Sequence, residues 1–291
     1  MKTIDKVKII IKYPFFMVSK LFYKKPDIMS SSHTVDYIKK HEVSVCRFGD
    51  GEIDLMNNVG IKFQNASKAL KDRLFEVAKT NDNRVLICIP DIFKSKNDLR
   101  KIMKLDIADW WHLHSVIFEG FYSKLFTHKN GDSLFTRFYY CYEKGFADDK
   151  YISDLRSIWE NRTVIFVEGN KSKNGIGNDL YDNVKERKRI ICPSENAFDK
   201  YDEILKTVSS LAKKDDLVLC SLGPTATILC YDLATKYNIR SIDVGHVDLE
   251  YEWYLRKASE KILIKGKDAS ETEYDYVETD SKVDNIIAVI K

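Results

Sequence analysis

Proline and glycine are scarce in this 291-residue sequence, which has only 5 and 12 of them. It contains no internal repeat and no low-complexity tract, and together these absences argue against long disordered linkers. Apolar residues make up 44% of the chain and charged residues 31%, an ordinary balance for a globular protein. A chain of this length can bury a substantial core, in one large domain or two small ones.

Cysteine pairs with metal-binding spacing are also absent. None of the six cysteines belongs to a CxxC pair, so a zinc site has no support. Most of them lie in apolar, strand-like runs such as RVLICIP and LVLCSLG. We therefore predict buried free thiols in a protein of the reducing cytoplasm.

A basic surface over the whole protein is absent as well. The formal net charge is +3, but residues 1–25 hold seven lysines and a single acid. The rest of the chain is slightly acidic, which argues against a nucleic-acid partner.

The first 28 residues form a basic and hydrophobic segment. Lysines and Pro14 interrupt its apolar runs, so it cannot span a bilayer, and it lacks the small-residue cleavage site of a signal peptide. Lysine mixed with Phe, Ile and Tyr suits a helix lying on anionic lipid. We expect a cytoplasmic protein that contacts the inner face of the membrane through residues 1–25. A helix docked on the protein's own surface is the alternative.

Beyond this segment, strand-like and helix-like runs alternate. The strand-like runs are continuous stretches of apolar and β-branched residues, at 43–48, 84–90, 163–169, 189–193, 217–223 and 240–246. Helix-like runs between them include 66–80, 104–125, 149–160, 200–214 and 225–237. Continuous apolar strands are typical of parallel sheets covered on both faces. We therefore predict an α/β fold with a doubly wound, mainly parallel, Rossmann-like sheet.

Five of the predicted strands end in polar or glycine-rich sequence, namely RFGDGE, VEGNKSKNGIGND, RIICPSENAFDKYDE, SLGPTAT and DVGHVDLEYEW. In a doubly wound sheet, ligands bind beyond the carboxyl ends of the strands. We expect these five ends to converge on one cleft.

The first of these strand ends carries Asp50 and Glu52, separated by one glycine. On an extended segment, residues i and i+2 point the same way, so both carboxylates would share a hard cation such as Mg²⁺ or Mn²⁺. Gly49 and Gly51 allow close backbone approach, and Arg47 would face a phosphate or stabilise the carboxylates. The DxE pattern alone is a weak signal, and a solvated loop is the alternative.

The sequence NGIGND is a candidate phosphate-binding loop. Gly175 and Gly177 precede Asn178 and Asp179, which would cap a helix at 179–185. Helix starts of this kind bind phosphate through backbone N–H groups. The loop matches neither the dinucleotide fingerprint nor the P-loop, so a plain turn is the alternative.

The sequence SLGPTAT is a second candidate. Gly223 and Pro224 make the turn, and Thr225 and Thr227 supply hydroxyls at the start of the next helix. A well-capped helix packed on the sheet explains the same residues.

In DVGHVDLEYEW, the residues His246, Asp248, Glu250 and Glu252 alternate with apolar ones. In an extended segment they line one face, which would give His246 a metal-ligand role and one acid the role of a base. If a helix starts at Asp248 instead, that residue is its N-cap and the glutamates favour the helix dipole.

The helical segment DWWHLH, at 109–114, places Trp110 and Trp111 beside two histidines. Aromatic faces stack on sugars and bases, so an acceptor site is one interpretation. Ordinary core or surface packing is the other.

Five motifs in order, RFGDGE, VEG…GIGNDL, CPSENAFDKYDEI, LGPTAT and DVGHVDLEYEW, resemble the bacterial glycosyltransferase family with the GT-D fold, formerly a domain of unknown function. The resemblance covers roughly residues 30–265. It implies a glycosyltransferase domain over 29–265, which we expect to be followed by a C-terminal extension of the same domain over 266–291.

The resemblance also implies functional residues. Asp50 and Glu52 match a DxE motif for Mn²⁺ or Mg²⁺, with His246 near the metal, and one of the carboxylates of Asp248, Glu250 and Glu252, with Asp248 and Glu250 favoured, would be the base. The loops at 175–179, 193–197 and 221–227 would hold UDP. The expected contacts to the nucleotide sugar are Arg47, Gly49, Gly175, Gly177, Asn178, Asp179, Pro193, Asn196, Ser221, Gly223 and Thr225.

The activity so implied is transfer of a hexose from a UDP-sugar to a glycan, lipid-linked glycan or glycoprotein, in surface polysaccharide synthesis or adhesin glycosylation. The cation would neutralise charge growing on the diphosphate, assisted by backbone N–H groups. Two alternatives are another nucleotide-dependent transferase and a non-catalytic, nucleotide-sugar-binding partner of a transferase. Intact Asp50 and Glu52 argue against the latter.

Overall fold

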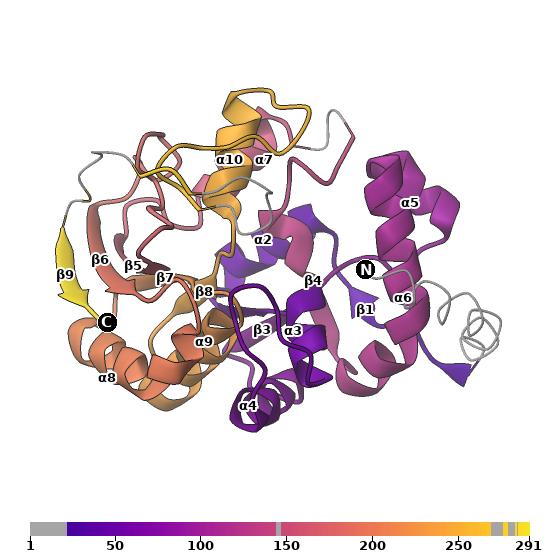
Figure 1. Cartoon of the computed structure of the whole chain (residues 1–291), viewed down its shortest axis with the longest axis horizontal. Helices are drawn as coiled ribbons and strands as arrows, with labels where there is room; N and C mark the ends of the chain where they lie inside the picture. Colours follow the sequence, from indigo (N-terminus) through magenta and orange to yellow (C-terminus); the bar gives the residue numbers. More distant parts are fainter. Residues whose placement is uncertain (1–21, 144–146, 269–275, 279–282, 284) are drawn as a thin grey trace.

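The computed structural model describes residues 22–143, 147–268, 276–278, 283 and 285–291. These residues form a nine-stranded sheet in the order β1-β4-β3-β2-β8-β7-β5-β6-β9 (Figure 1). Every pair of neighbouring strands is parallel, which confirms the predicted doubly wound α/β fold. The strands are β1 (Asp27–Ile28), β2 (Ser44–Arg47), β3 (Val85–Ile89), β4 (Lys129–Asp132), β5 (Thr163–Gly169), β6 (Glu186–Cys192), β7 (Leu217–Ser221), β8 (Ser241–Asp243) and β9 (Ile286–Val289).

Helices fill most of the connections between the strands. They are α2 (Ser31–His41), α3 (Asp50–Met56), α4 (Lys68–Ala78), α5 (Lys96–Ile102), α6 (Leu105–Leu125), α7 (Asp149–Arg156), α8 (Tyr201–Leu211), α9 (Pro224–Tyr237) and α10 (Val247–Leu255), with short 3-10 helices at Ser133–Thr136 and Ala197–Lys200. All six strand-like runs and the five helix-like runs between them are present as strands and helices, with differences at their ends.

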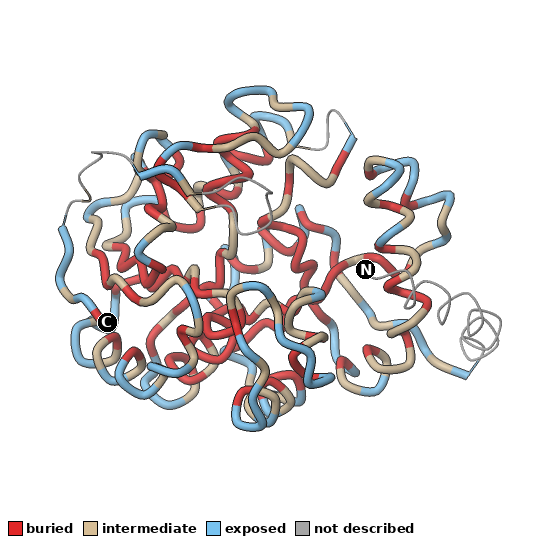
Figure 2. Tube along the Cα trace, in the orientation of Figure 1, coloured by how far each residue is buried: buried red, intermediate tan, exposed pale blue. Residues whose placement is uncertain are grey.

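The sheet has a hydrophobic core on each face. In β5, Ile165 and Val167 belong to one core, whereas Val164 and Phe166 belong to the other. Helices α4, α8 and α9 contribute to the first core and α2 and α7 to the second, so buried residues run through the middle of the molecule (Figure 2). Cover on both faces explains why the central strands read as unbroken apolar runs.

The strand order reverses between β2 and β8, which pair through Val45 and Ile242 at the centre of the sheet. From β2 the chain winds outward through β3 and β4. In its second half, β7 and β8 follow on the β2 side of β5, and β6 and β9 lie on the other side of β5. Open α/β sheets bind ligands beyond the carboxyl ends of the strands at such a switch point.

Two local predictions are wrong. Asp50 and Glu52 lie on helix α3 and not on an extended segment, because the helix begins directly after Gly49. Residues 179–185 form turns and no helix.

Strand β4 was missed because its sequence, KNGD, is polar. Its Asp132 is buried, and the carboxylate accepts hydrogen bonds from the Ser31 hydroxyl and from the backbone N–H groups of Asp91 and Leu134. A side chain at Gly131 would lie 2.5 Å from the Cys88 sulfur, so only glycine fits there. These contacts form only in the folded chain and leave no hydrophobic pattern.

The predicted membrane-surface segment falls mostly on residues 1–21, which lie outside the described residues. None of the helices described in the structure is long and apolar enough to cross a membrane. Toward the carboxyl end, β9 pairs with β6, and Lys267 forms ion pairs with Asp248 and Glu252. The domain boundaries at 28 and 265 stay predictions.

A fully buried ion pair fixes the loop after β5. Arg189 on β6 donates to the Glu168 carboxylate and, at 2.8 Å, to the Asn174 carbonyl oxygen. The backbone N–H and the side-chain amide of Asn174 both donate to Glu168 at 2.7 Å. Arg189 and Glu168 therefore set the position of Asn174.

We expect Arg189→Met to lower the free energy of unfolding by about 3–5 kcal/mol, because Glu168 would remain buried without its partner. Urea denaturation followed by circular dichroism measures the change. Lys68→Met, which breaks the exposed pair with Asp72, is the control and should leave stability nearly unchanged. Equal, small effects of both substitutions would contradict the role given to Arg189.

Candidate active site

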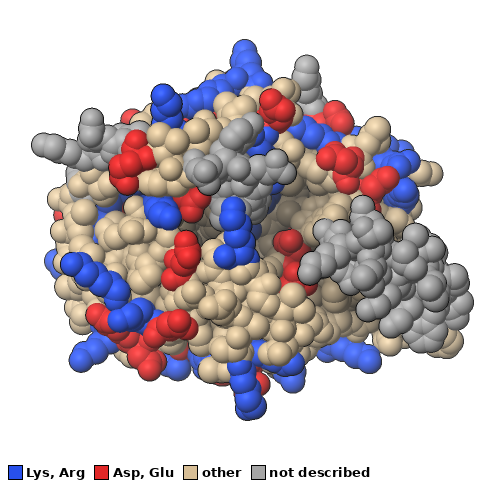
Figure 3. Space-filling view, viewed as in Figure 1, with Lys and Arg blue, Asp and Glu red and all other residues tan. Residues whose placement is uncertain are grey.

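A cleft of about 670 Å³ opens at the carboxyl ends of the central strands. This volume lies within the usual range for sites that bind small molecules. The face in Figure 3 is hollowed near its centre, with acidic and basic side chains at the edge of the hollow. Residues at or just after the ends of β2, β5, β6, β7 and β8 line the cleft, including Arg47, Asn174, Ser194, Ser221 and Asp243. The expected convergence of five strand ends is confirmed.

Asp50 and Glu52 occupy the first turn of α3, and both line the cleft. Residues two apart on a helix point in different directions, so the reasoning from an extended segment fails. Glu52 instead turns back and accepts a hydrogen bond of 2.7 Å from the backbone N–H of Gly49. The GDGE sequence is thus a helix start in which the second acid caps its own helix.

Burial raises the pKa of Glu52 to about 7. The Gly49 N–H opposes this shift, and the negative charge of Asp243 adds to it. The charged form of Glu52 is therefore poorly compensated by the protein itself. A cation bound beside it would favour the ionised carboxylate.

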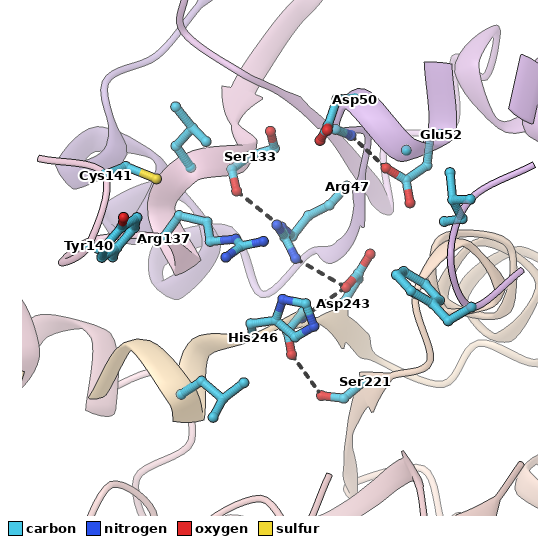
Figure 4. A pocket seen from close by; sticks show the side chains of 18 of the residues that line it. Arg47, Asp50, Glu52, Ser133, Arg137, Tyr140, Cys141, Ser221, Asp243 and His246 are labelled. Atoms are coloured by element: carbon cyan, nitrogen blue, oxygen red, sulfur yellow. Dashed lines mark hydrogen bonds and ion pairs between the residues drawn. The ribbon is translucent and has the colours of Figure 1, made fainter. Parts of the chain in front are cut away.

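Arg47 links three segments at the base of the cleft (Figure 4). Its Nε donates to the Ser133 carbonyl oxygen at 3.1 Å, and its Nη1 lies 3.4 Å from Oδ1 of Asp243. Its own carbonyl oxygen accepts from the Thr227 hydroxyl at 2.8 Å. Gly245 has φ +49°, and a Cβ there would lie 1.9 Å from Arg47 Nη1. Glycine at this position is therefore required for the observed place of the guanidinium.

Positive charge gathers around His246 at the same end of the cleft (Figure 4). Burial holds the pKa of His246 well below its ordinary value, and Arg137, Arg47 and Lys261 lower it further. The imidazole is therefore neutral. Within the described part of the chain, no three His, Cys, Asp or Glu side chains are grouped to hold a metal. The role of His246 as a ligand stays a prediction.

The segment after β8 is helical, which supports the second of its two interpretations. Helix α10 begins at Val247 with His246, and not Asp248, at the N-cap position. Asp248 lines the cleft, but it accepts hydrogen bonds from the Gly175 N–H and the Lys267 ammonium. These contacts tie α10 to the loop after β5.

Glu250 is not among the residues that line the cleft. Its carboxylate accepts from the backbone N–H groups of Tyr139 and Tyr140, at 3.0 and 2.7 Å. The carboxylates of Asp248 and Glu250 thus both make hydrogen bonds that hold neighbouring segments together. A role as base stays a prediction for each and gains no support from this arrangement.

Of the predicted nucleotide contacts, Arg47, Gly49, Ser221 and Gly223 line the cleft. Others lie outside its lining, namely Gly175, Gly177, Asn178, Asp179, Pro193, Asn196 and Thr225. Asn178 instead donates to Asp248 and Glu252, and Asp179 accepts from the Tyr251 hydroxyl. The loop at 221–227 thus lines the cleft through predicted residues and the loop at 193–197 through Ser194, whereas the loop at 175–179 is represented only by its neighbours Ser172 and Asn174.

Several lining residues were not predicted. Asp243 is the first residue of the DVGH sequence and ends β8. Ser133 and Arg137 follow β4, the strand concealed by its polar sequence. Phe63 and Lys261 lie in irregular segments without a sequence signal. The tryptophans of DWWHLH, Trp110 and Trp111, do line the cleft.

Comparison with known proteins identifies the class to which this fold and cleft belong. The family model described as "Glycosyltransferase GT-D fold" matches residues 45–272, most of the chain. This chain therefore belongs to the GT-D-fold glycosyltransferase family.

Among individual relatives, the "Probable glycosyl transferase Gly" of Streptococcus gordonii is 34% identical over 265 residues, which are 89% of this chain and 38% of that protein. "Glycosyltransferase GlyD" of Streptococcus pneumoniae serotype 4 is 32% identical over 89% of this chain and 32% of that protein. The chain thus spans about a third of the length of these curated relatives.

Solved structures agree. One, described as a domain of unknown function 1792 with a distinct glycosyltransferase fold, superposes with a TM-score of 0.84 at 32% identity and covers 92% of this chain and 96% of its own. "A New Glycosyltransferase (DUF1792) from Streptococcus sanguinis" has a TM-score of 0.83 at 31% identity, over 92% of this chain and 100% of its own.

Glu52→Gln tests the electrostatics of the cleft without any ligand. The pKa of Glu52 is raised in the folded protein to about 7, so the folded state holds a proton that the unfolded chain releases near pH 4.5. Stability contributed by this group therefore falls as pH rises between these values. We expect Glu52→Gln to match wild type below pH 4.5 and to be about 3 kcal/mol more stable above pH 7.

Urea denaturation in EDTA across this pH range measures the difference. Glu203→Gln, on the exposed side of α8, is the control for loss of one negative charge. A Glu52→Gln variant that is no more stable than wild type above pH 7 would contradict this prediction. It would show that nearby groups already compensate the negative charge of the ionised Glu52 carboxylate.

Proposed function

We propose that this protein transfers a hexose from a UDP-sugar to a glycan or glycoprotein acceptor, using Mn²⁺ or Mg²⁺ held by Asp50 and Glu52. One observation carries the proposal: in a glycosyltransferase-family fold, two carboxylates and a cluster of cations line a single cleft at the switch point of the sheet. A nucleoside diphosphate with its cation matches both kinds of charge.

The residues fit a hard divalent cation. Asp50 and Glu52 offer oxygen ligands, and Glu52 is half-buried with too little positive charge around it. Magnesium and manganese commonly bind through one or two carboxylates, with phosphate and water oxygens completing the shell. When bound, the cation would neutralise charge on the leaving diphosphate.

Basic side chains of the protein would also neutralise the negative charge of the diphosphate. Arg47, Arg137 and Lys261 line the cleft around neutral His246, where they would attract and orient the diphosphate. The start of α9 at Gly223 also lines it, and exposed N–H groups at helix starts favour phosphate. Phe63, packed against the Gly223 turn, offers apolar surface for the base.

We expect UDP to bind the wild-type protein in Mn²⁺ and to bind at least about tenfold more weakly in EDTA or in Glu52→Gln, because the metal and its ligand are then missing. Isothermal titration calorimetry measures each affinity. Asp54→Asn is the matched control, since Asp54 lies on α3 but not among the residues that line the cleft. Equal affinity with and without metal would assign Asp50 and Glu52 a structural role.

Turnover separates this function from its alternatives. With a UDP-hexose and acceptor, we expect wild type to release UDP and Glu52→Gln to be slower by about two orders of magnitude. Another released product would indicate a different nucleotide-dependent transferase. UDP-sugar binding without turnover would indicate a non-catalytic partner.

The fixed place of Arg47 gives a further prediction. We expect Gly245→Ala to weaken UDP binding about tenfold, because the new methyl group displaces the Arg47 guanidinium. Gly177→Ala is the matched control: Gly177 also has positive φ, +84°, but its Cβ would contact nothing within 4 Å. Calorimetry with UDP and Mn²⁺ compares the two. Similar losses in both would show that backbone strain, and not Arg47, accounts for the effect.

A further inference from the structure

Trp110 is unusual among the large aromatic residues of this chain. It is 44% exposed, yet it lines the cleft together with Trp111, the next residue on α6. Trp111 is almost fully buried and belongs to the hydrophobic core. Core packing therefore explains Trp111 but leaves an indole surface of Trp110 open to whatever enters the cleft.

The exposed indole is held in place from below. Its ring stacks on the His114 ring, with centroids 5.5 Å apart and planes 22° from parallel. The Trp111 ring meets it edge-on, with centroids 4.6 Å apart. A flat aromatic face fixed before binding loses little entropy when a ligand ring stacks on it.

Polar groups line the same cleft as this aromatic face. Asp106 lines the cleft one helical turn before Trp110, on the same side of α6. Tyr140 also lines the cleft, with the Lys261 ammonium 5.0 Å from its ring centroid. An apolar shelf bordered by a carboxylate, a phenol and an ammonium offers stacking for the C–H face of a sugar and hydrogen bonds for its hydroxyls.

The exposed face of Trp110 lies in the same cleft as the Asp50 carboxylate. Lys261 lines this cleft as well. Burial lowers the pKa of His114 and, together with Arg137, that of Lys261, and the negative charge of Asp50 opposes both shifts. A hydroxyl of a ligand resting on Trp110 would therefore approach the region where the donor sugar leaves its diphosphate.

We propose that Trp110, with Asp106, Tyr140 and Lys261 around it, is the acceptor subsite, and that the acceptor is a saccharide whose pyranose ring stacks on Trp110. This inference rests on the proposed glycosyl transfer and adds the chemical class of the acceptor. A polypeptide hydroxyl or a lipid alcohol would gain little from a flat indole bordered by charged groups.

Saturation-transfer NMR tests the subsite with methyl β-glycosides of glucose, galactose and N-acetylglucosamine, each with and without UDP and Mn²⁺. We expect signals from at least one glycoside with wild type and about tenfold weaker binding with Trp110→Ala, and an intermediate effect with Trp110→Phe. Tyr237→Ala, which removes an exposed aromatic at the end of α9, should bind as wild type does.

Calorimetric titration of UDP in the presence of Mn²⁺ distinguishes failure of the acceptor subsite from failure of the proposed donor function. Trp110→Ala should keep the wild-type affinity for UDP, so that only the acceptor is affected. Glycosides that bind Trp110→Ala as well as wild type, or that do not bind wild type at all, would overturn the subsite. If wild type does not bind UDP, the proposed donor function is overturned, and the glycoside experiment then tests only whether Trp110 binds a saccharide.

Discussion

The contact between Arg47 and Asp243 joins the two halves of the sheet at the place where the cleft forms. Arg47 ends β2 and Asp243 ends β8, the strands between which the order of the sheet reverses. The same guanidinium holds the segment after β4 through Ser133, and Gly245 leaves room for it. Groups from three parts of the chain thus depend on one side chain, and the sheet topology brings them together.

Charge is unevenly arranged within this cleft, which bears on what it can hold. Glu52 is half-buried with a raised pKa, whereas His246 is kept neutral by burial and by the cations around it. The cleft therefore offers carboxylates to a cation and basic side chains to an anion. A metal-bound nucleoside diphosphate carries both, and the aromatic shelf on α6 adds a third surface suited to a sugar ring.

Much of the fold could be predicted from unbroken apolar runs, because parallel strands buried on both faces have that pattern. Asp50 and Ser221 could also be predicted to line the cleft, because ligands bind beyond the carboxyl ends of parallel strands. What was missed depends on contacts between distant segments. Strand β4 is polar because its groups are satisfied by α2, and the Glu52 side chain caps its own helix. Glu250 is an acid whose backbone partners no spacing could reveal.

The most direct test of a metal-bound donor in this cleft is anomalous scattering from crystals soaked with MnCl₂ and UDP. The account predicts one manganese peak within bonding distance of the Asp50 and Glu52 carboxylates and of the UDP phosphates, with Arg47 beside them. A peak elsewhere, or UDP bound in the cleft with no manganese at these carboxylates, would contradict it.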